Sequence, residues 1–584
     1  MKYQATFDSE YKILNSEQRK AVDTIEGPVM VVAGPGTGKT QILALRICNI
    51  LKQTDTQAYN ILCLTFTEQG ALEMKKRLMK FMGADAYKVH IHTYHSFARK
   101  VISENPDHFD NYKLDAISDL ESAQLLKEII DELDYDSPLF TVSDYSKYNS
   151  VGNLKSLYGT MKQEHWSPDY LKERINERLE FHRTADPELK YKRGNKKTGV
   201  EVGDLKEKDF NKIKKSYERS IAAIETYDKY NQKMKDANRY DFNDMIEWTI
   251  DALKSNDDIR LDYQEQYHYI LADEFQDSNG SQMNILSLLV QDVEQPNLFV
   301  VGDDDQSIYR FQGANLENLA DYQKGFKPEL IVLLNNYRSS NYIVEASKKV
   351  IDYNHGRLSK RLNFDKNFIA EGKYKAVDIT PQLLQFENVI AEEAYIYNYI
   401  KKAKEEGRDL SEIAVLFKKH KIAKELIKVL TKENIPVNVK RKVDVLKVPY
   451  IVNIINVLEL ISKLHLGDYR VDHLIPDYFN LPAFEIKFND VYKIGRYLKE
   501  INAEAFKARR EGNTDNKMIT WTDVIFDSDH LDKALGSDTN IHTAIEILQG
   551  WVKLVSESTV QIIFQKILDE GGFLTDALTA SDNY

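Results

Sequence analysis

The sequence contains little cysteine: Cys48 and Cys63 are the only two in 584 residues. Both lie among apolar residues, which predicts buried, reduced thiols and argues against a disulfide framework or a cysteine-based zinc site. The chain also has no apolar run long enough to cross a bilayer and no charged-then-apolar leader at its start. We therefore expect a cytoplasmic protein that does not enter a membrane.

The sequence also has fewer basic than acidic residues: 79 Lys and Arg against 91 Asp and Glu, which gives a net charge of −12. At face value this balance argues against a nucleic-acid partner. A binding groove needs only local basicity, however, and residues 190–215 carry ten basic side chains against four acidic ones. Residues 355–375 and 440–442 are further basic clusters, although by itself each is most simply a solvated surface.

The apolar residues gather in short runs that are typical of buried parallel strands separated by helices. These runs are residues 29–32, 61–66, 89–93, 269–272, 298–301, 331–334 and 411–417. They predict an α/β protein with two doubly wound, parallel-sheet domains, each carrying a mostly helical insertion. The expected division is 1–110 with 240–330 for the first α/β domain, 111–239 for its insertion, 331–448 for a partial second α/β domain, and 449–584 for a second, incomplete helical insertion.

Residues 33–40 (AGPGTGKT) carry the strongest single signal. They follow an apolar β-branched run and lead into apolar residues at helical spacing, which is the context of a phosphate-binding loop. The glycines let backbone N–H groups point at phosphate oxygens at the start of a helix. Lys39 is expected to reach the β- and γ-phosphates, and Thr40 to give its hydroxyl to Mg²⁺. The loop alone does not exclude a simple glycine-rich turn.

Two adjacent carboxylates, Asp273 and Glu274, follow the apolar run at residues 269–272. The carboxyl ends of parallel strands are where phosphates bind in such folds. Asp273 is therefore expected to hold Mg²⁺, and Glu274 to orient and deprotonate the attacking water. An acidic turn is the simpler alternative, but the phosphate-binding loop makes it less favourable.

Two later strand ends add polar and aromatic groups. Gln306 is suited to sense a γ-phosphate, because an amide donates a hydrogen bond without adding charge. Tyr309 and Phe311 either stack on unpaired bases, at about 1–3 kcal/mol each, or pack in a hairpin. Arg338, in residues 335–340 (NNYRSS), either neutralises charge at the γ-phosphate or is an ordinary surface arginine.

Taken in order, these motifs resemble those of superfamily 1 DNA helicases of the UvrD/Rep/PcrA type. The segments that carry the resemblance are residues 14–18 (LNSEQ), 33–40, 65–77 (TFTEQGALEMKKR), 93–99 (TYHSFAR), 240–245 (YDFNDM), 273–276 (DEFQ), 302–314 and 336–339 (NYRS). The resemblance implies two RecA-like motor domains that close on ATP and reopen on hydrolysis. It further implies movement 3′ to 5′ along single-stranded DNA and action at single-strand/duplex junctions in repair, replication or recombination.

The resemblance also assigns roles to individual residues, with ATP and Mg²⁺ as the cofactors. Gln18 is expected to read adenine, and Tyr337 to stack on the base. The implied nucleotide-binding set is Gln18, Gly34, Pro35, Gly36, Thr37, Gly38, Lys39, Thr40, Arg46, Tyr337 and Arg338. The implied catalytic set is Lys39, Asp273, Glu274, Gln306 and Arg338, with Thr40 and Asp273 on the metal. The single-strand channel is expected to be lined by Phe66, His95, Tyr309 and Phe311.

The sequence also departs from the family pattern. Glu68 and Gln69 stand where Asn and Lys are usual, and Gln312 stands where Arg is usual, which should weaken phosphate contacts. Nothing in residues 457–584 resembles the family's last motifs. We therefore expect an N-terminal portion of a longer protein that binds ATP but turns over and unwinds poorly.

Two other functions stay open at this point. One is the motor half of a helicase–nuclease of the RecB or AddA kind, which a downstream nuclease domain would decide. The other is a nucleotide-gated DNA-binding or recruitment module without unwinding activity. Glu274 disfavours the second, because a pure binding module has no need of a carboxylate for the attacking water. RNA is a less favoured substrate than DNA.

Overall fold

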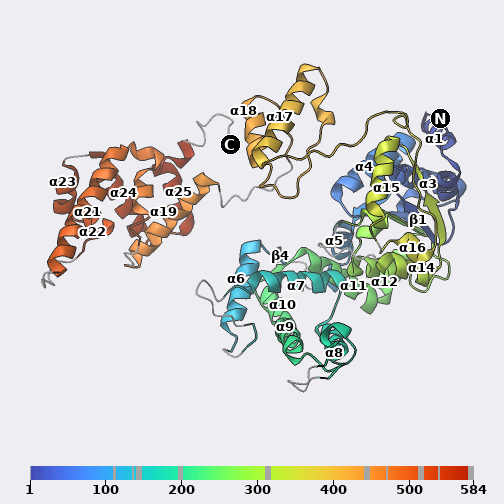
Figure 1. The fold of residues 1–584 in the computed structure, drawn as a ribbon, viewed down its shortest axis with the longest axis horizontal. Helices are drawn as coiled ribbons and strands as arrows, with labels where there is room; N and C mark the ends of the chain where they lie inside the picture. Colours follow the sequence, from blue (N-terminus) through green and yellow to red (C-terminus); the bar gives the residue numbers. More distant parts are fainter. Residues whose placement is uncertain are drawn as a thin grey trace. The chain divides into compact units, whose positions relative to one another are not determined.

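The computed structural model describes residues 2–109, 114–134, 137–139, 148–194, 201–308, 317–354, 356–439, 448–467, 471–510, 518–536 and 539–575. The chain forms two compact units, Met1–Leu383 and Leu384–Tyr584. Figure 1 shows a sheet and its covering helices in the first unit and helices in the second.

A six-stranded sheet in the order β3-β2-β6-β7-β1-β8 is the centre of the first unit, and every pairing in it is parallel. The strands are β1 (Val29–Ala33), β2 (Ile61–Thr65), β3 (His90–Thr93), β6 (Tyr269–Ala272), β7 (Leu298–Gly302) and β8 (Glu329–Leu333). The predicted parallel α/β class is thus confirmed. The strands form from near-continuous apolar runs because helices cover both faces.

Alternate residues along β1 point into two different cores. Met30 and Val32 join a cluster with α5 (Tyr94–Glu104), α11 (Phe242–Ser255) and α13 (Gly280–Leu289). Val29 and Val31 join a second cluster with α2 (Ser16–Asp23), α3 (Lys39–Gln53) and α4 (Glu68–Met82). The remaining helices of this layered body are α1 (Lys2–Lys12), α12 (Asp257–Gln266), α14 (Glu317–Phe326), α15 (Asn341–Ile351) and α16 (Leu358–Leu362). The two-residue period of a strand therefore places the sheet between two helical layers.

Strand β8 corrects one expectation. The apolar run at 331–334 was predicted to open a second α/β unit, but β8 pairs with β1 along its whole length, from Glu329 opposite Val29 to Leu333 opposite Ala33. The run therefore completes the first sheet. The chain then forms β9 (Asn335–Asn336), which pairs in parallel with β10 (Ile369–Ala370).

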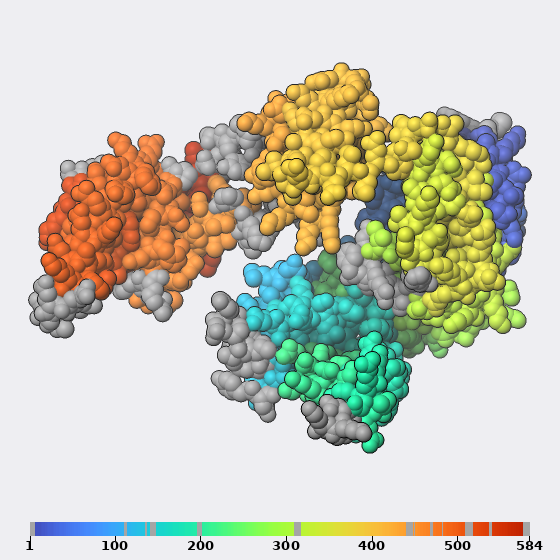
Figure 2. Space-filling model, viewed as in Figure 1, coloured from blue at the N-terminus to red at the C-terminus, as the bar shows by residue number. Residues whose placement is uncertain are grey.

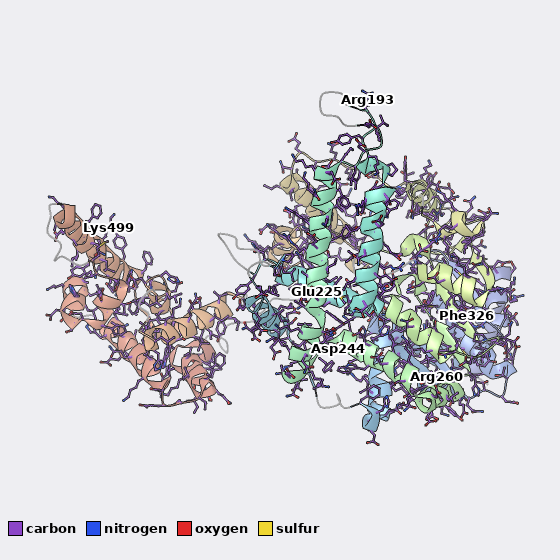
Figure 3. All side chains as sticks on the ribbon, turned by 90° about the horizontal axis from the view of Figure 1, so that it is seen from below. Arg193, Glu225, Asp244, Arg260, Phe326 and Lys499 are labelled. Atoms are coloured by element: carbon purple, nitrogen blue, oxygen red, sulfur yellow. The ribbon has the colours of Figure 1, made fainter. Side chains whose placement is uncertain are left out.

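A helical insertion lies between β4 (Asp115–Ala116) and β5 (Arg239–Tyr240), which pair with each other at its base. Its helices are α6 (Asp119–Asp131), α7 (Val151–Glu164), α8 (Pro168–Thr184), α9 (Glu207–Glu225) and α10 (Tyr227–Asp236). They share a core of their own, and their cyan-to-green atoms pack together in Figure 2. Figure 3 shows α8 and α9 side by side, with Arg193 near one end of the pair and Glu225 near the other.

A buried lysine joins this insertion to the core. The side chain of Lys162 on α7 is 1% exposed, and its Nζ lies 2.7 Å from Asp241 Oδ2 and 2.6 Å from Asp244 Oδ1. Asp241 caps α11 by accepting hydrogen bonds from the main-chain N–H groups of Asn243 and Asp244. One ammonium group of the insertion therefore fixes the first turn of a core helix.

The regular elements in the described residues of the second unit are all helical. Its helices are α17 (Val389–Glu405), α18 (Lys424–Lys432), α19 (Pro449–His465), α20 (Ile475–Phe479), α21 (Phe488–Arg510), α22 (Trp521–Phe526), α23 (Ser528–Leu535), α24 (Thr539–Leu554) and α25 (Val560–Glu570). The strand predicted at residues 411–417 is wrong: this segment is a short 3₁₀ turn, Leu410–Glu412, followed by irregular chain. Among the described residues of this unit none pairs in a sheet, and Val415 and Leu416 are left exposed.

Both cysteines are free thiols in the layers around the sheet. Cys63 on β2 is buried and Cys48 on α3 is half-buried, which confirms the prediction for the first and qualifies it for the second. Burial raises the pKa of Cys48 to about 12, so its thiol stays protonated at neutral pH. None of the described helices combines the length and the apolar character needed to cross a bilayer.

Candidate active site

The carboxyl edge of the sheet gathers most of the residues singled out in the sequence. Because all six strands are parallel, their carboxyl ends meet at one edge. The groups that follow the strands are the glycine loop after β1, Phe66 after β2, His95 after β3, Asp273 and Glu274 after β6, Gln306 after β7, and Tyr337 and Arg338 after β8. Residues as far apart in the chain as Pro35 and Asn336, which are 301 positions apart, thus share one rim.

The glycine loop needs its glycines in this structure. Gly36 and Gly38 have φ angles of 68° and 90°, and Gly38 immediately precedes the first residue of α3. A Cβ added at Gly36 would lie 2.6 Å from Arg338 Cβ, so any side chain there would displace the arginine. Thr37 closes the loop by donating its hydroxyl to the Gly34 carbonyl at 2.8 Å. The half-buried Thr40 follows on α3.

An ion pair joins the loop lysine to the second strand-end carboxylate. Lys39 Nζ lies 2.6 Å from Glu274 Oε2, with side chains 12% and 39% exposed. Glu274 adopts the left-handed conformation, with a φ of 48°, which is unfavourable for a residue with a side chain and often marks a functional position. Burial acts to raise the pKa of Glu274, but the charge of Lys39, a hydrogen bond from Gln276 and the charge of Arg338 outweigh it and lower the pKa. Glu274 is therefore a carboxylate at neutral pH.

Asp273 lies between this pair and the sheet. Its Oδ1 accepts the main-chain N–H of Glu274 at 2.9 Å, which fixes the carboxylate. Burial, with the neighbouring Glu274 charge, raises the pKa of Asp273 to about 6. A hard divalent cation favours the ionised form of such a group. Its carboxylate and the Thr40 hydroxyl are the oxygen donors that suit Mg²⁺, so the donor chemistry fits the expected metal.

The arginine loop is fastened to the glycine loop through the main chain. Tyr337 N–H donates to the Gly36 carbonyl at 2.8 Å, and Asn336 Nδ2 donates to the Pro35 carbonyl at 2.6 Å. Asn336 Oδ1 in turn accepts the main-chain N–H of Arg338 at 3.0 Å. Asn336 was not assigned a role from the sequence, although it belongs to the NYRS segment. It is the side chain that places Arg338 beside the loop.

Gln18 and Tyr337 lie on the same side of the loop and are linked through Asn15. Gln18 is buried and donates from Nε2 to the Thr37 carbonyl at 2.8 Å, while its Oε1 accepts the Asn15 N–H at 3.1 Å. Asn15 Nδ2 donates to the Tyr337 hydroxyl at 2.8 Å. Gln18 thus supports the loop, and one amide N–H of its side chain is left for a base.

Arg46 does not belong to this group, which corrects the expected nucleotide-binding set. Its side chain is 1% exposed, and it donates to the carbonyls of Ala21, Thr24 and Ile25. The guanidinium also stacks 4.3 Å from the centroid of the Phe299 ring. Arg46 therefore holds the end of α2 against the sheet, and both of its Nη groups are used by these carbonyls.

Gln306 is held by a carboxylate that the sequence did not suggest. Its Nε2 donates to Asp303 Oδ2 at 2.6 Å. Asp303, Asp304 and Asp305 converge within reach of one ion, the one such group found among the described residues. Lys366 occupies their centre, however, so the cluster already contains its cation.

The expected single-strand contacts are only partly described. Tyr309 and Phe311 lie outside the described residues. Phe66 and His95 are half-buried at neighbouring strand ends, and burial lowers the pKa of His95, which keeps its ring neutral at pH 7. Phe242, at the start of α11, is 56% exposed and meets His95 edge to face with 6.5 Å between ring centroids. The signal that could have found it is the aromatic in YDFNDM.

Comparison with known proteins adds the decisive observation. The UvrD/REP helicase N-terminal domain matches residues 14–327 of this chain, and the UvrD-like helicase C-terminal domain matches residues 331–466. The first match alone covers more than half of the sequence. The chain belongs to the UvrD/REP helicase family. The family resemblance seen in the motifs is thus confirmed.

Several relatives of this UvrD/REP chain are ATP-dependent DNA helicases PcrA. The protein from Leuconostoc citreum is 28% identical over 427 residues, which is 72% of this chain and 49% of that protein. The proteins from Staphylococcus epidermidis and Staphylococcus aureus are 27% and 26% identical over 504 and 502 residues, each covering 86% of this chain and 60% of the relative. The chain therefore spans about half to three fifths of the length of these relatives.

Proposed function

We propose that this chain uses ATP and Mg²⁺ to move 3′ to 5′ along single-stranded DNA, as the motor of a DNA helicase. The observation that carries the proposal is the Lys39–Glu274 ion pair at the sheet edge, with Arg338 fastened beside it. A lysine, a carboxylate and an arginine around one glycine loop form the charge pattern that phosphoryl transfer to water requires.

The ion pair suggests how binding and hydrolysis are linked. In the structure, Lys39 neutralises Glu274. When the phosphates of ATP enter the glycine loop they offer Lys39 a stronger negative partner, and the carboxylate of Glu274 is released. Glu274 is then able to accept a proton from the attacking water, because losing the Lys39 contact makes the carboxylate more basic, while Gln276 and Arg338 still favour its ionised form. The base therefore becomes active only where a triphosphate is bound.

The other groups of the rim complete the proposed reaction. Thr40 and Asp273 would hold Mg²⁺, which neutralises charge on the β- and γ-phosphates when bound. Gln306 would donate to the γ-phosphate, and Arg338 would stabilise the charge that develops as the phosphoryl group leaves. Gln18 and Tyr337 would receive the base. Arg338 lies beside Gly36, and its charge acts on Glu274 as that of Lys39 does, so both cations would contact a triphosphate held in the loop.

Single-stranded DNA, including single-strand/duplex junctions, is the proposed partner. His95 and Phe242 are in ring contact at the sheet edge, Phe66 follows the neighbouring strand β2, and we include Tyr309 and Phe311 from the sequence pattern. Stacking on aromatic faces tolerates any base order, which suits a protein that moves along DNA. The division into two motor domains with helical insertions, a role in repair, replication or recombination, and a cytoplasmic location remain parts of this proposal.

The function is tested by nucleotide binding and hydrolysis with and without single-stranded DNA. We expect saturable binding of Mg²⁺-ATP and slow hydrolysis that rises when an oligonucleotide is added, and strong stimulation at ordinary helicase turnover would contradict the expected poor turnover. Lys39→Ala should weaken ATP binding at least tenfold, because the loop loses its charged donor, while DNA affinity without ATP stays near that of the wild type. A wild-type chain that binds no nucleotide, or that hydrolyses ATP as fast after Lys39→Ala, would contradict the proposal.

Phe242 provides a test of the DNA surface that does not touch the nucleotide site. Phe242→Ala should weaken binding of a fluorescent oligo(dT) by about 1–3 kcal/mol, because one stacking face is lost. ATP binding should not change. Leu261→Ala, at another exposed apolar residue on α12, is the matched control and should leave DNA affinity unchanged. Equal DNA affinity of the Phe242 variant and the wild type would remove this residue from the channel.

A further inference from the structure

A buried charge cluster lies directly behind Gln306. The side chain of Lys366 is 1% exposed, and its Nζ lies 2.5 Å from Asp303 Oδ1 and 2.9 Å from Asp305 Oδ2. It also forms an ion pair with Asp304. Removing a lysine from water is costly, and three carboxylates around one ammonium offset that cost. The burial of the Lys366 ammonium therefore indicates that this cluster has a specific role.

Asp303 connects this lysine to the proposed γ-phosphate sensor. The Asp303 side chain is fully buried. Its Oδ1 faces Lys366 and accepts the main-chain N–H of Asp305 at 3.1 Å, while its Oδ2 accepts Gln306 Nε2 at 2.6 Å. Each oxygen therefore has a fixed partner, and the carboxylate cannot turn. One N–H and the carbonyl oxygen of the Gln306 amide are left for a ligand.

The segment that carries Lys366 is itself tied to the same loop. Arg357 forms two hydrogen bonds with Asp305, at 3.0 and 2.8 Å, and the main-chain N–H of Leu358 donates to Asp304 Oδ2 at 2.6 Å. The three aspartates thus hold both the beginning of α16 and the lysine that follows it. The segment and the Gln306 loop form one rigid assembly.

The same segment continues to the other two loops of the site. A Cβ added at Gly34 would lie 2.1 Å from the ring of Phe368, so this ring packs directly on the glycine loop. Ile369 and Ala370 then pair with β9, whose last residue, Asn336, precedes Tyr337 and Arg338. Within five residues the chain contacts the Gln306 loop, the glycine loop and the arginine loop.

We propose that Lys366 is a positioning residue for ATP hydrolysis, which acts through Asp303 to hold the Gln306 amide where it reads the terminal phosphate. The inference rests on the proposed function, because it presumes that Gln306 faces a γ-phosphate. It goes beyond that function by assigning the discrimination between ATP and ADP to a residue that lies some 60 positions further along the chain. Lys366 itself does not touch the nucleotide.

The test is to compare the affinities of ADP and a non-hydrolysable ATP analogue, both with Mg²⁺, by titration calorimetry. In Lys366→Met the analogue should lose about tenfold in affinity relative to ADP, the effect of one charge-assisted hydrogen bond. Gln306→Ala should give the same change. The double variant should be no worse than Gln306→Ala, because both substitutions remove one interaction. A purely structural lysine would weaken both nucleotides alike and would add to Gln306→Ala.

Two further variants separate positioning from misfolding. Lys366→Met with Asp304→Asn removes one charge of each sign, keeps the net charge of the cluster, and should reproduce the single variant with a higher melting temperature. Arg361 lies on the same segment as Lys366 and forms an exposed ion pair with Glu317. The variant Arg361→Met should bind both nucleotides like the wild type. The inference is overturned if the charge-balanced variant discriminates ATP from ADP as the wild type does. A wild type that binds neither nucleotide overturns the proposed function, and the inference with it.

Discussion

Replacing Glu274 with Gln is expected to slow ATP hydrolysis by about 10²–10⁴-fold, the range for loss of a general base. An amide keeps the size of the side chain but cannot accept the proton of the attacking water. ATP should bind at least as tightly as before, because Lys39 is no longer held by a carboxylate at 2.6 Å. Single-turnover hydrolysis and equilibrium binding, measured on the same preparation, check both halves of this result.

The sign of the binding change makes this prediction specific. A substitution that merely damaged the fold would weaken ATP binding and hydrolysis together. Glu265→Gln, at an exposed carboxylate on α12, is the matched control and should leave both unchanged. Hydrolysis at the wild-type rate in the Glu274 variant would show that another group activates the water.

Replacing Arg338 with Ala is expected to reduce hydrolysis by about 10³–10⁵-fold, as for other arginines that stabilise phosphoryl transfer. Arg338 is exposed beside the glycine loop, where its charge already acts on Glu274, and a γ-phosphate bound there would be a stronger negative partner. ADP should bind to the variant nearly as well as to the wild type, because ADP lacks that phosphate. The measurement is the hydrolysis rate at saturating ATP, with ADP affinity from a fluorescent analogue.

Arg338→Lys distinguishes charge from geometry at this position. An ammonium keeps the positive charge but not the planar fork of donors, so we expect partial recovery of the rate. Lys348→Ala, in an exposed pair with Glu345 on α15, should leave hydrolysis unchanged. If the Arg338→Ala variant hydrolyses ATP like the wild type, Arg338 is an ordinary surface arginine with no role in hydrolysis.

The sheet and its rim were largely predictable from the sequence because local patterns specify them. The buried runs that became β1, β2, β6 and β7 are each followed by residues predicted for the site. Parallel pairing then brings these groups to one edge without further information. Lys39 and Glu274 were expected in one site for this reason, and the structure places them in contact.

Features that depend on tertiary partners were not predictable. An apolar run indicates that a strand is buried, but it does not indicate which strand it pairs with. For this reason β8 was assigned to the wrong sheet. Residues 411–417 have the same pattern but find no neighbouring strand among the described residues. Arg46 and Lys366 are misleading in the same way, because a basic side chain suggests a surface or a ligand, and only the fold reveals that carbonyls or carboxylates surround it.

The buried contact of Lys162 with Asp241 and Asp244 bears on how the insertion can move. Withdrawing that ammonium would leave the largely buried Asp244 without its counter-ion and Asp241 with main-chain partners alone, a loss on the order of 3–5 kcal/mol. Thermal motion at ordinary temperature rarely supplies that much, so tilting of the helical arm must carry the beginning of α11 with it. Phe242 is the next residue after Asp241, and any swing of the arm would therefore shift the aromatic face beside His95.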